Sequence, residues 1–128
     1  MASVIGIGGI FFKSPNPEKL RAWYNQYLNM NCSEYGASIS PTKMPKGSFN
    51  VWTPFANDTS YFEPSTNNFM FNLVVDDLEG ALKQVKSGKA TILDNQEDSE
   101  YGKFGWFIDP DGNKVELWEP NAKNKVSE

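Results

Sequence analysis

The stretch Phe104-Gly-Trp-Phe-Ile-Asp-Pro-Asp-Gly-Asn-Lys-Val-Glu-Leu-Trp-Glu-Pro120 decides the fold. Two strand-like apolar runs, 103–108 and 113–119, flank a group of turn-forming residues. Asp, Pro, Gly and Asn in succession favour a tight turn, so the stretch predicts a β-hairpin. Side chains alternate along a strand, which places Glu116 on one face of the second run together with Lys114 and Trp118.

The hairpin closes a larger unit that spans about residues 68–119. The apolar run Phe69–Val75 predicts a strand, and Asp76-Asp77-Leu78-Glu79 then supplies a capping box for a helix. Apolar residues at helical spacing follow as far as Gly88, which is a typical helix end. A further strand is expected near 90–94. The order strand, helix and three strands is a βαβββ unit.

The first half of the chain, about residues 4–62, repeats this order. The apolar run 5–12 predicts a strand, and Asn16-Pro17 a helix start. An apolar stripe at i, i+3, i+4 and i+7 continues the helix to Leu28. Shorter strands are expected near 32–39, 48–53 and 60–62.

These two repeats predict one α+β domain over residues 1–120, built from paired βαβββ modules. Each module would carry one helix behind a mixed, curved sheet, because each helix has a single apolar stripe. The space between the two sheets would form a hollow, where a small molecule could bind. The polar residues 121–128 show no periodicity and are expected to be a flexible tail.

Composition excludes several classes of function. The 128 residues contain no histidine, so a Ser-His-Asp triad, a Cys-His pair and an imidazole metal site are all ruled out. The formal net charge of −4 argues against a nucleic-acid partner. No apolar run is long enough to predict a membrane span. With a single cysteine, Cys32, and no visible secretory signal, we expect a cytoplasmic protein.

The repeat and the ending 104–120 resemble the vicinal oxygen chelate superfamily, which includes glyoxalase, bleomycin-resistance and ring-cleaving dioxygenase proteins. The resemblance covers about residues 5–120. The middle, Trp52–Phe62 and Phe69–Leu78, resembles a largely uncharacterised bacterial branch. The resemblance implies paired βαβββ modules, a homodimer and a small-molecule site in the hollow of the sheets.

The same resemblance implies four positions for metal ligands on the inner strands. They fall on Gly9, on Asn50 or Trp52, on Met70 and on Glu116. Only Glu116 has a side chain that commonly binds a metal, and a zinc, nickel or iron enzyme needs two or three such ligands. We therefore predict no metal site and no cofactor.

Glu116 is the candidate catalytic residue, because a carboxylate that faces the hollow could act as a general base. The alternative is a structural carboxylate that points outward or pairs with Lys114. Asn72 lies in an apolar run and needs a hydrogen-bond partner, either a substrate or a neighbouring strand. Candidate ligand-binding residues in addition to Asn72 are Trp118, Met70, Trp52 and Tyr101.

Three functions are compatible with these features. The first is metal-independent binding of a small, partly apolar molecule, with isomerase or lyase chemistry by proton transfer at Glu116. The second is sequestration of a drug or metabolite without chemistry, as in bleomycin-resistance proteins. The third is a metal-dependent lyase or dioxygenase with displaced ligands.

Overall fold

The computed structural model describes residues 1–121, and the C-terminal part of the expected tail lies outside them. The elements, in chain order, are α1 (Pro17–Leu28), a short 3₁₀ helix (Pro41–Lys43), β1 (Phe71–Val74), α2 (Leu78–Ser87), β2 (Thr91–Ser99), β3 (Gly102–Ile108) and β4 (Lys114–Pro120). The α+β class is therefore confirmed. Among the described residues no helix is long and apolar enough to cross a membrane.

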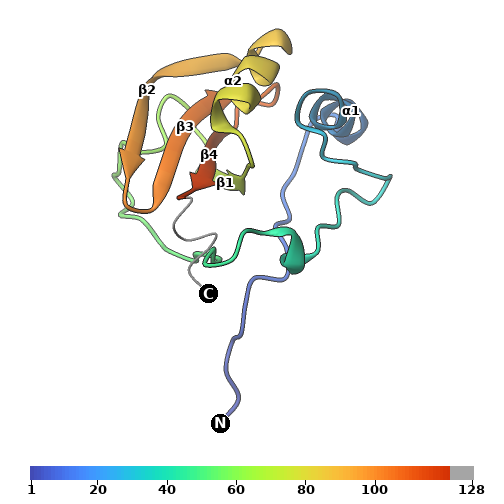
Figure 1. Cartoon of the computed structure of the whole chain (residues 1–128). Helices are drawn as coiled ribbons and strands as arrows, with labels where there is room; N and C mark the ends of the chain where they lie inside the picture. The colour runs from blue at the N-terminus through green and yellow to red at the C-terminus, as the bar shows by residue number, and fades with distance from the viewer. Residues whose placement is uncertain (122–128) are drawn as a thin grey trace.

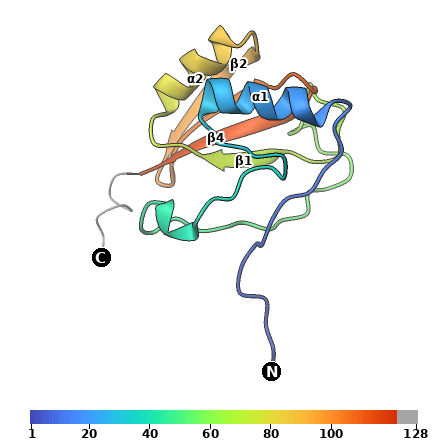
Figure 2. The ribbon, with the colours of Figure 1, turned by 90° about the vertical axis from the view of Figure 1, so that its right-hand side faces the viewer.

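One mixed sheet with the strand order β1-β4-β3-β2 forms the centre of the molecule. β1 pairs with β4 in parallel, while β3 is antiparallel to both β4 and β2. Both helices lie on one face of this sheet, and the long irregular segment between α1 and β1 runs past the other face (Figures 1 and 2). This order of elements from β1 to β4 is the predicted βαβββ module of the second half.

The core lies between the helices and the sheet. Val115 and Leu117 from β4, Phe107 from β3 and Val85 from α2 are completely buried there. The Asn16 cap forms as predicted, because Asn16 Oδ1 accepts a hydrogen bond from the Lys19 N–H. At α2 the cap within the predicted capping box is Asp77, whose Oδ1 accepts a hydrogen bond from the Gly80 N–H.

α1 is fixed to the second half by side-chain hydrogen bonds. Trp23 Nε1 donates to the Gly88 carbonyl at 2.9 Å, and the Tyr24 hydroxyl donates to Asp109 Oδ2 at 2.8 Å in the β3–β4 turn. Burial, followed by the charge of Asp109, raises the pKa of Tyr24, so the hydroxyl keeps its proton and remains a donor. The helix of the first half thus completes the core of the second.

The strands predicted in the first half are not present in the structure, and the complete βαβββ module is that of the second half. Residues 5–12, 48–53 and 60–62 have no strand ladder, and 32–39 contains only an isolated bridge between Ser33 and Gly36. Residues 5–12 have the apolar pattern of a strand but no neighbouring strand to pair with.

Candidate functional site

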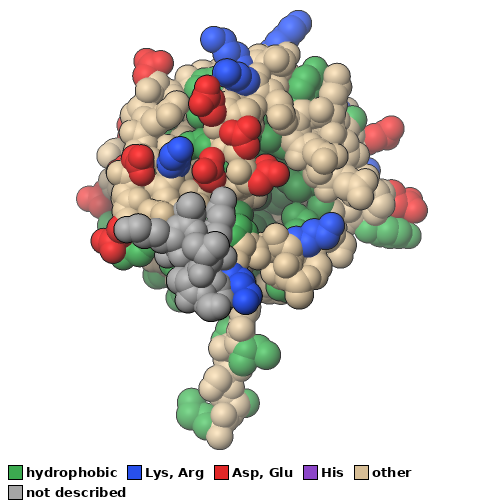
Figure 3. Space-filling model, in the orientation of Figure 1, with side chains coloured by type: hydrophobic (Ala, Val, Ile, Leu, Met, Phe, Trp, Pro, Cys, Tyr) green, Lys and Arg blue, Asp and Glu red, His purple; other side chains and the backbone are tan. Residues whose placement is uncertain are grey.

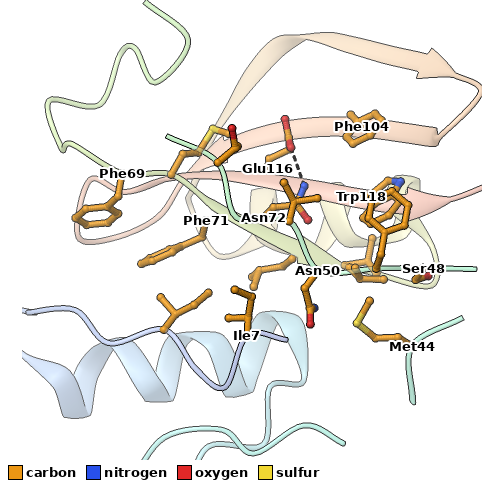
Figure 4. A pocket seen from close by; sticks show the side chains of 18 of the residues that line it. Ile7, Met44, Ser48, Asn50, Phe69, Phe71, Asn72, Phe104, Glu116 and Trp118 are labelled. Atoms are coloured by element: carbon orange, nitrogen blue, oxygen red, sulfur yellow. Dashed lines mark hydrogen bonds between the residues drawn. The ribbon is translucent and has the colours of Figure 1, made fainter. Parts of the chain in front are cut away.

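The face of the sheet opposite the helices borders a large hollow. Its volume is about 2550 Å³, which exceeds the roughly 300–1000 Å³ of a fitted small-molecule pocket and indicates an open cavity. The hollow lies between the sheet and the irregular segment before β1, and its walls carry mostly apolar side chains (Figure 4).

β4 brings Glu116 and Trp118 to this hollow by strand alternation. Val115 and Leu117 point into the core, so their neighbours on the strand point the opposite way. Glu116 is only 9% exposed, yet its side chain lines the hollow. The predicted direction of this carboxylate is therefore confirmed.

Three donors converge on the Glu116 carboxylate. Asn72 Nδ2 donates to Oε1 at 2.7 Å, and Tyr61 Oη and Trp106 Nε1 donate to Oε2 at 2.6 Å and 2.9 Å. Asn72 and Trp106 lie beside Glu116 on β1 and β3, in direct register with it. Such bonds offset the cost of burying the charge.

Tyr61 reaches Glu116 from an irregular turn rather than from the sheet. Its ring stacks on Phe55 with centroids 5.6 Å apart and meets Trp106 edge-on. Burial, followed by the hydrogen bond to Glu116, raises the pKa of Tyr61. The hydroxyl therefore remains protonated and continues to donate to the carboxylate.

Lys114 does not form the alternative ion pair with Glu116 among the described residues. Its ammonium donates to the Tyr61 carbonyl and lies over the rings of Tyr61 and Trp106. Burial lowers the pKa of Lys114, and the charges of Glu116 and Glu63 act in the opposite direction. Lys114 thus supports the turn that carries Tyr61.

An aromatic wall continues the hollow beyond Glu116. Trp118 packs parallel to Phe104 with centroids 6.0 Å apart and meets Phe49 edge-on at 5.6 Å. Trp118 Nε1 donates to the Tyr101 carbonyl at 2.7 Å, which fixes the indole against the β2–β3 turn. Tyr101 itself is half exposed at the rim.

The structure brings together most of the predicted site residues. Glu116, Asn72, Trp118, Met70 and Tyr101 all line the hollow. Trp52 does not: it is 80% exposed and only its neighbours Val51 and Thr53 line the cavity.

Sequence reasoning missed the part that Tyr61 and Trp106 play. Neither was among the predicted site residues, whereas the polar atoms of both donate to Glu116. The position of Trp106 could have been found from the hairpin register, which pairs it with Glu116. No sequence signal placed Tyr61, because its turn has no ladder to fix it.

The donor set of the site does not fit a divalent metal ion. Within residues 1–121 no three or more potential ligands of the His, Cys, Asp or Glu type lie together. The Glu116 carboxylate is surrounded by N–H and O–H donors rather than by further ligands. Of the two alternatives for the second metal-ligand position, Asn50 and Trp52, Asn50 lines the hollow, and its side chain is an amide rather than a carboxylate or imidazole.

Comparison with known proteins gives one family match. The model of the glyoxalase-like domain family matches residues 9–118. None of the curated proteins compared with the chain matches it.

Several solved structures are similar to the chain. One is a member of the glyoxalase/bleomycin resistance protein/dioxygenase superfamily from Sphaerobacter thermophilus, with 22% identity, 81% of this chain and 88% of that chain covered, and a TM-score of 0.47. Another comes from the mobile metagenome of V. Pseudocholerae. It is 16% identical, the match covers 90% of this chain and 96% of that chain, and the TM-score is 0.48. A third is an integron cassette protein of V. Cholerae. It is 18% identical, the match covers 90% of this chain and 97% of that chain, and the TM-score is 0.46.

Proposed function

The chain belongs to the glyoxalase-like domain family, and from that premise we propose that it binds a small organic molecule in the hollow without a metal ion. The observation that carries this proposal is a carboxylate, held by three donors, at the inner wall of an otherwise largely apolar cavity. Ligand sites typically combine an apolar lining with a few fixed polar groups. We assign Glu116 and Asn72 as the polar groups that meet the ligand, and Trp118, Met70 and Tyr101 as its apolar contacts.

Metal-dependent lyase or dioxygenase chemistry has little support in this chain. Such enzymes hold the ion with at least three protein ligands, whereas Glu116 is the one strong ligand at the four positions implied by the resemblance. Two functions therefore remain for the binding site: sequestration of a drug or metabolite, and catalysis without a metal.

Proton transfer at Glu116 is the second candidate function. It is favoured by one observation: among residues 1–121, Oε1 accepts a hydrogen bond from Asn72 alone, which leaves one of its lone-pair positions open. A substrate proton next to a carbonyl group could be taken there, with Tyr61 staying protonated beside it. Saturable binding without product formation would instead support sequestration.

Filling the hollow is expected to abolish binding. Asn50 lines the hollow from its irregular wall (Figure 4), so the indole of Asn50→Trp is expected to take up space in the cavity. In a thermal-shift screen with a metabolite and antibiotic panel, a ligand at 100 times its Kd stabilises the wild-type protein by about 2.7 kcal/mol. The Asn50→Trp variant should lose this shift.

The matched control is Asn95→Trp, on the exposed edge strand β2 and outside the hollow. It should retain the full shift for every ligand that stabilises the wild-type protein. If Asn50→Trp responds to those ligands as strongly as the control does, the ligand does not bind in the hollow and the proposal is wrong.

We also propose that two copies of the chain associate, in a cytoplasmic setting suited to the single thiol of Cys32. The N-terminal end of the chain projects from the body of the molecule with hydrophobic side chains along it (Figure 3), while Ile7 and Ile10 of the N-terminal segment 1–12 line the hollow. Ile5 and Phe11 are 101% and 96% exposed. Apolar surface of this kind marks an interaction site in a soluble protein.

Sedimentation velocity is expected to give a dimer for the wild-type chain and a monomer for Phe11→Asp. Tyr35→Asp is the control, because Tyr35 is equally exposed but lies outside the N-terminal segment. A wild-type protein that sediments as a monomer at all concentrations would refute association, and an equal effect of both substitutions would place the contact elsewhere.

A further inference from the structure

Around Glu116, the wall of the hollow offers hydrogen-bond acceptors to a ligand. The hydroxyl of Tyr61 and the indole N–H of Trp106 are both used by Glu116 Oε2. Asn72 turns its Nδ2 toward Oε1, which leaves its Oδ1 without a hydrogen bond among the described residues. Two oxygens remain available, Oε1 of Glu116 and Oδ1 of Asn72, and we call them the acceptor pair.

The acceptor pair carries a negative charge, and Glu116 forms no ion pair among the described residues, although Lys43 and Lys46 also line the hollow. The ammonium of Lys114 lies behind Tyr61, where it donates to the backbone carbonyl, and Lys114 is not among the described residues that line the hollow. Tyr61 therefore separates this cation from the ligand space. A ligand group that meets the acceptor pair must donate hydrogen bonds and is favoured when it is positive.

Aromatic surface lies within reach of the same point. Trp118 is two residues from Glu116 on the same face of β4, which places their side chains about 7 Å apart along the strand. Phe104 and Phe49 extend the ring of Trp118 into a continuous wall. Aromatic faces attract cations and also bury apolar groups, so this wall suits the body of an organic cation.

We infer that the hollow selects protonated amines whose ammonium group binds Glu116 Oε1 and Asn72 Oδ1 and whose apolar body packs on Trp118, Phe104 and Phe49. This inference deepens the proposed function and rests on it, since it names the ligand class of the same site. A metal ion needs three or more ligands, but an ammonium group is satisfied by two acceptors and solvent, and so fits this site.

Three probes of equal shape test the inference: 2-phenylethylamine, 2-phenylethanol and phenylacetate. At pH 7 the first is a cation, the second is neutral and the third is an anion. Their Kd values are measured on the full chain by NMR titration, using the indole N–H signals of Trp106 and Trp118 as reporters. The amine is expected to bind about tenfold more tightly than the alcohol, a difference of about 1.4 kcal/mol, and the anion more weakly than both.

Glu116→Gln should remove this preference. The carbonyl of the new side chain can keep the bonds from Tyr61 and Trp106, while its amide faces Asn72, which then turns its own oxygen inward. Both members of the acceptor pair are lost, so amine and alcohol should bind within about twofold of each other. Glu34→Gln changes the net charge equally at an exposed position and should keep the tenfold preference.

The outcomes separate this inference from the proposed function. If all three probes bind the wild-type chain with equal Kd values, the hollow binds small molecules but the inference of cation selection is wrong. If none of them binds and the broader panel also fails, the proposed function is wrong as well. The wild-type comparison decides between these results even if Glu116→Gln does not fold.

Discussion

A Gly102→Ala substitution is expected to lower the free energy of unfolding by about 3 kcal/mol, as measured by urea denaturation. Gly102 opens β3 with φ of +125°, a backbone conformation that L-residues rarely adopt. An added methyl group would meet the carbonyl oxygen of Glu119 and would lie 2.9 Å from Pro120 Cα. These are backbone atoms of the paired strand β4, so they cannot rotate aside as a side chain would.

Gly112→Ala provides the control for this expectation. Gly112 also has a positive φ, +81°, but no atom lies within 4 Å of the position of its added methyl group. It should therefore show only the backbone strain, about 1 to 2 kcal/mol. If both variants lose the same free energy of unfolding, the close approach of β4 contributes nothing to the effect at Gly102.

The Gly102 variant should also loosen the aromatic wall of the hollow. The neighbouring residue Tyr101 supplies the carbonyl that accepts the indole hydrogen bond of Trp118. Displacing the start of β3 displaces this acceptor as well. A larger loss of amine-probe affinity in Gly102→Ala than in Gly112→Ala would follow from that link.

The second half of the fold could be predicted because its signals are local. The turn residues from Asp109 to Asn113 fix the hairpin, and the hairpin fixes which residues of β3 and β4 lie opposite each other. Alternation along β4 then gives the direction of Glu116, and the apolar run before α2 gives β1. Every step depends on residues close together in the sequence.

The contacts that complete the site depend instead on distant residues. Tyr61 is 55 residues before Glu116, and its position follows from stacking on Phe55 and from the Lys114 ammonium rather than from any periodicity. Trp52 was expected on an inner strand, but with no ladder in that segment nothing imposes alternation, and its ring points away from the hollow. Strand patterns in the sequence predict sheet structure only where a partner edge is present.

Replacing Glu116 by leucine is expected to lower the free energy of unfolding by about 3 kcal/mol and to abolish binding of the amine probe. Leucine fills a similar volume but accepts no hydrogen bond. The hydroxyl of Tyr61 and the amide of Asn72 can turn toward solvent, because both residues are exposed. The indole N–H of Trp106 cannot, since Trp106 is buried beneath Tyr61, so this donor carries most of the penalty.

Comparison with Glu116→Gln and Glu97→Leu isolates the cause of this loss. Glutamine keeps an acceptor for Trp106 and should cost no more than about 1 kcal/mol, although it removes the same charge. Glu97→Leu makes the same change at an exposed position of β2, where the carboxylate accepts no hydrogen bond among those described, and should stay within about 0.5 kcal/mol of the wild-type protein. If Glu116→Leu is as stable as the wild-type protein in urea denaturation, the three donors do not depend on the carboxylate, and Glu116 is free to serve the ligand alone.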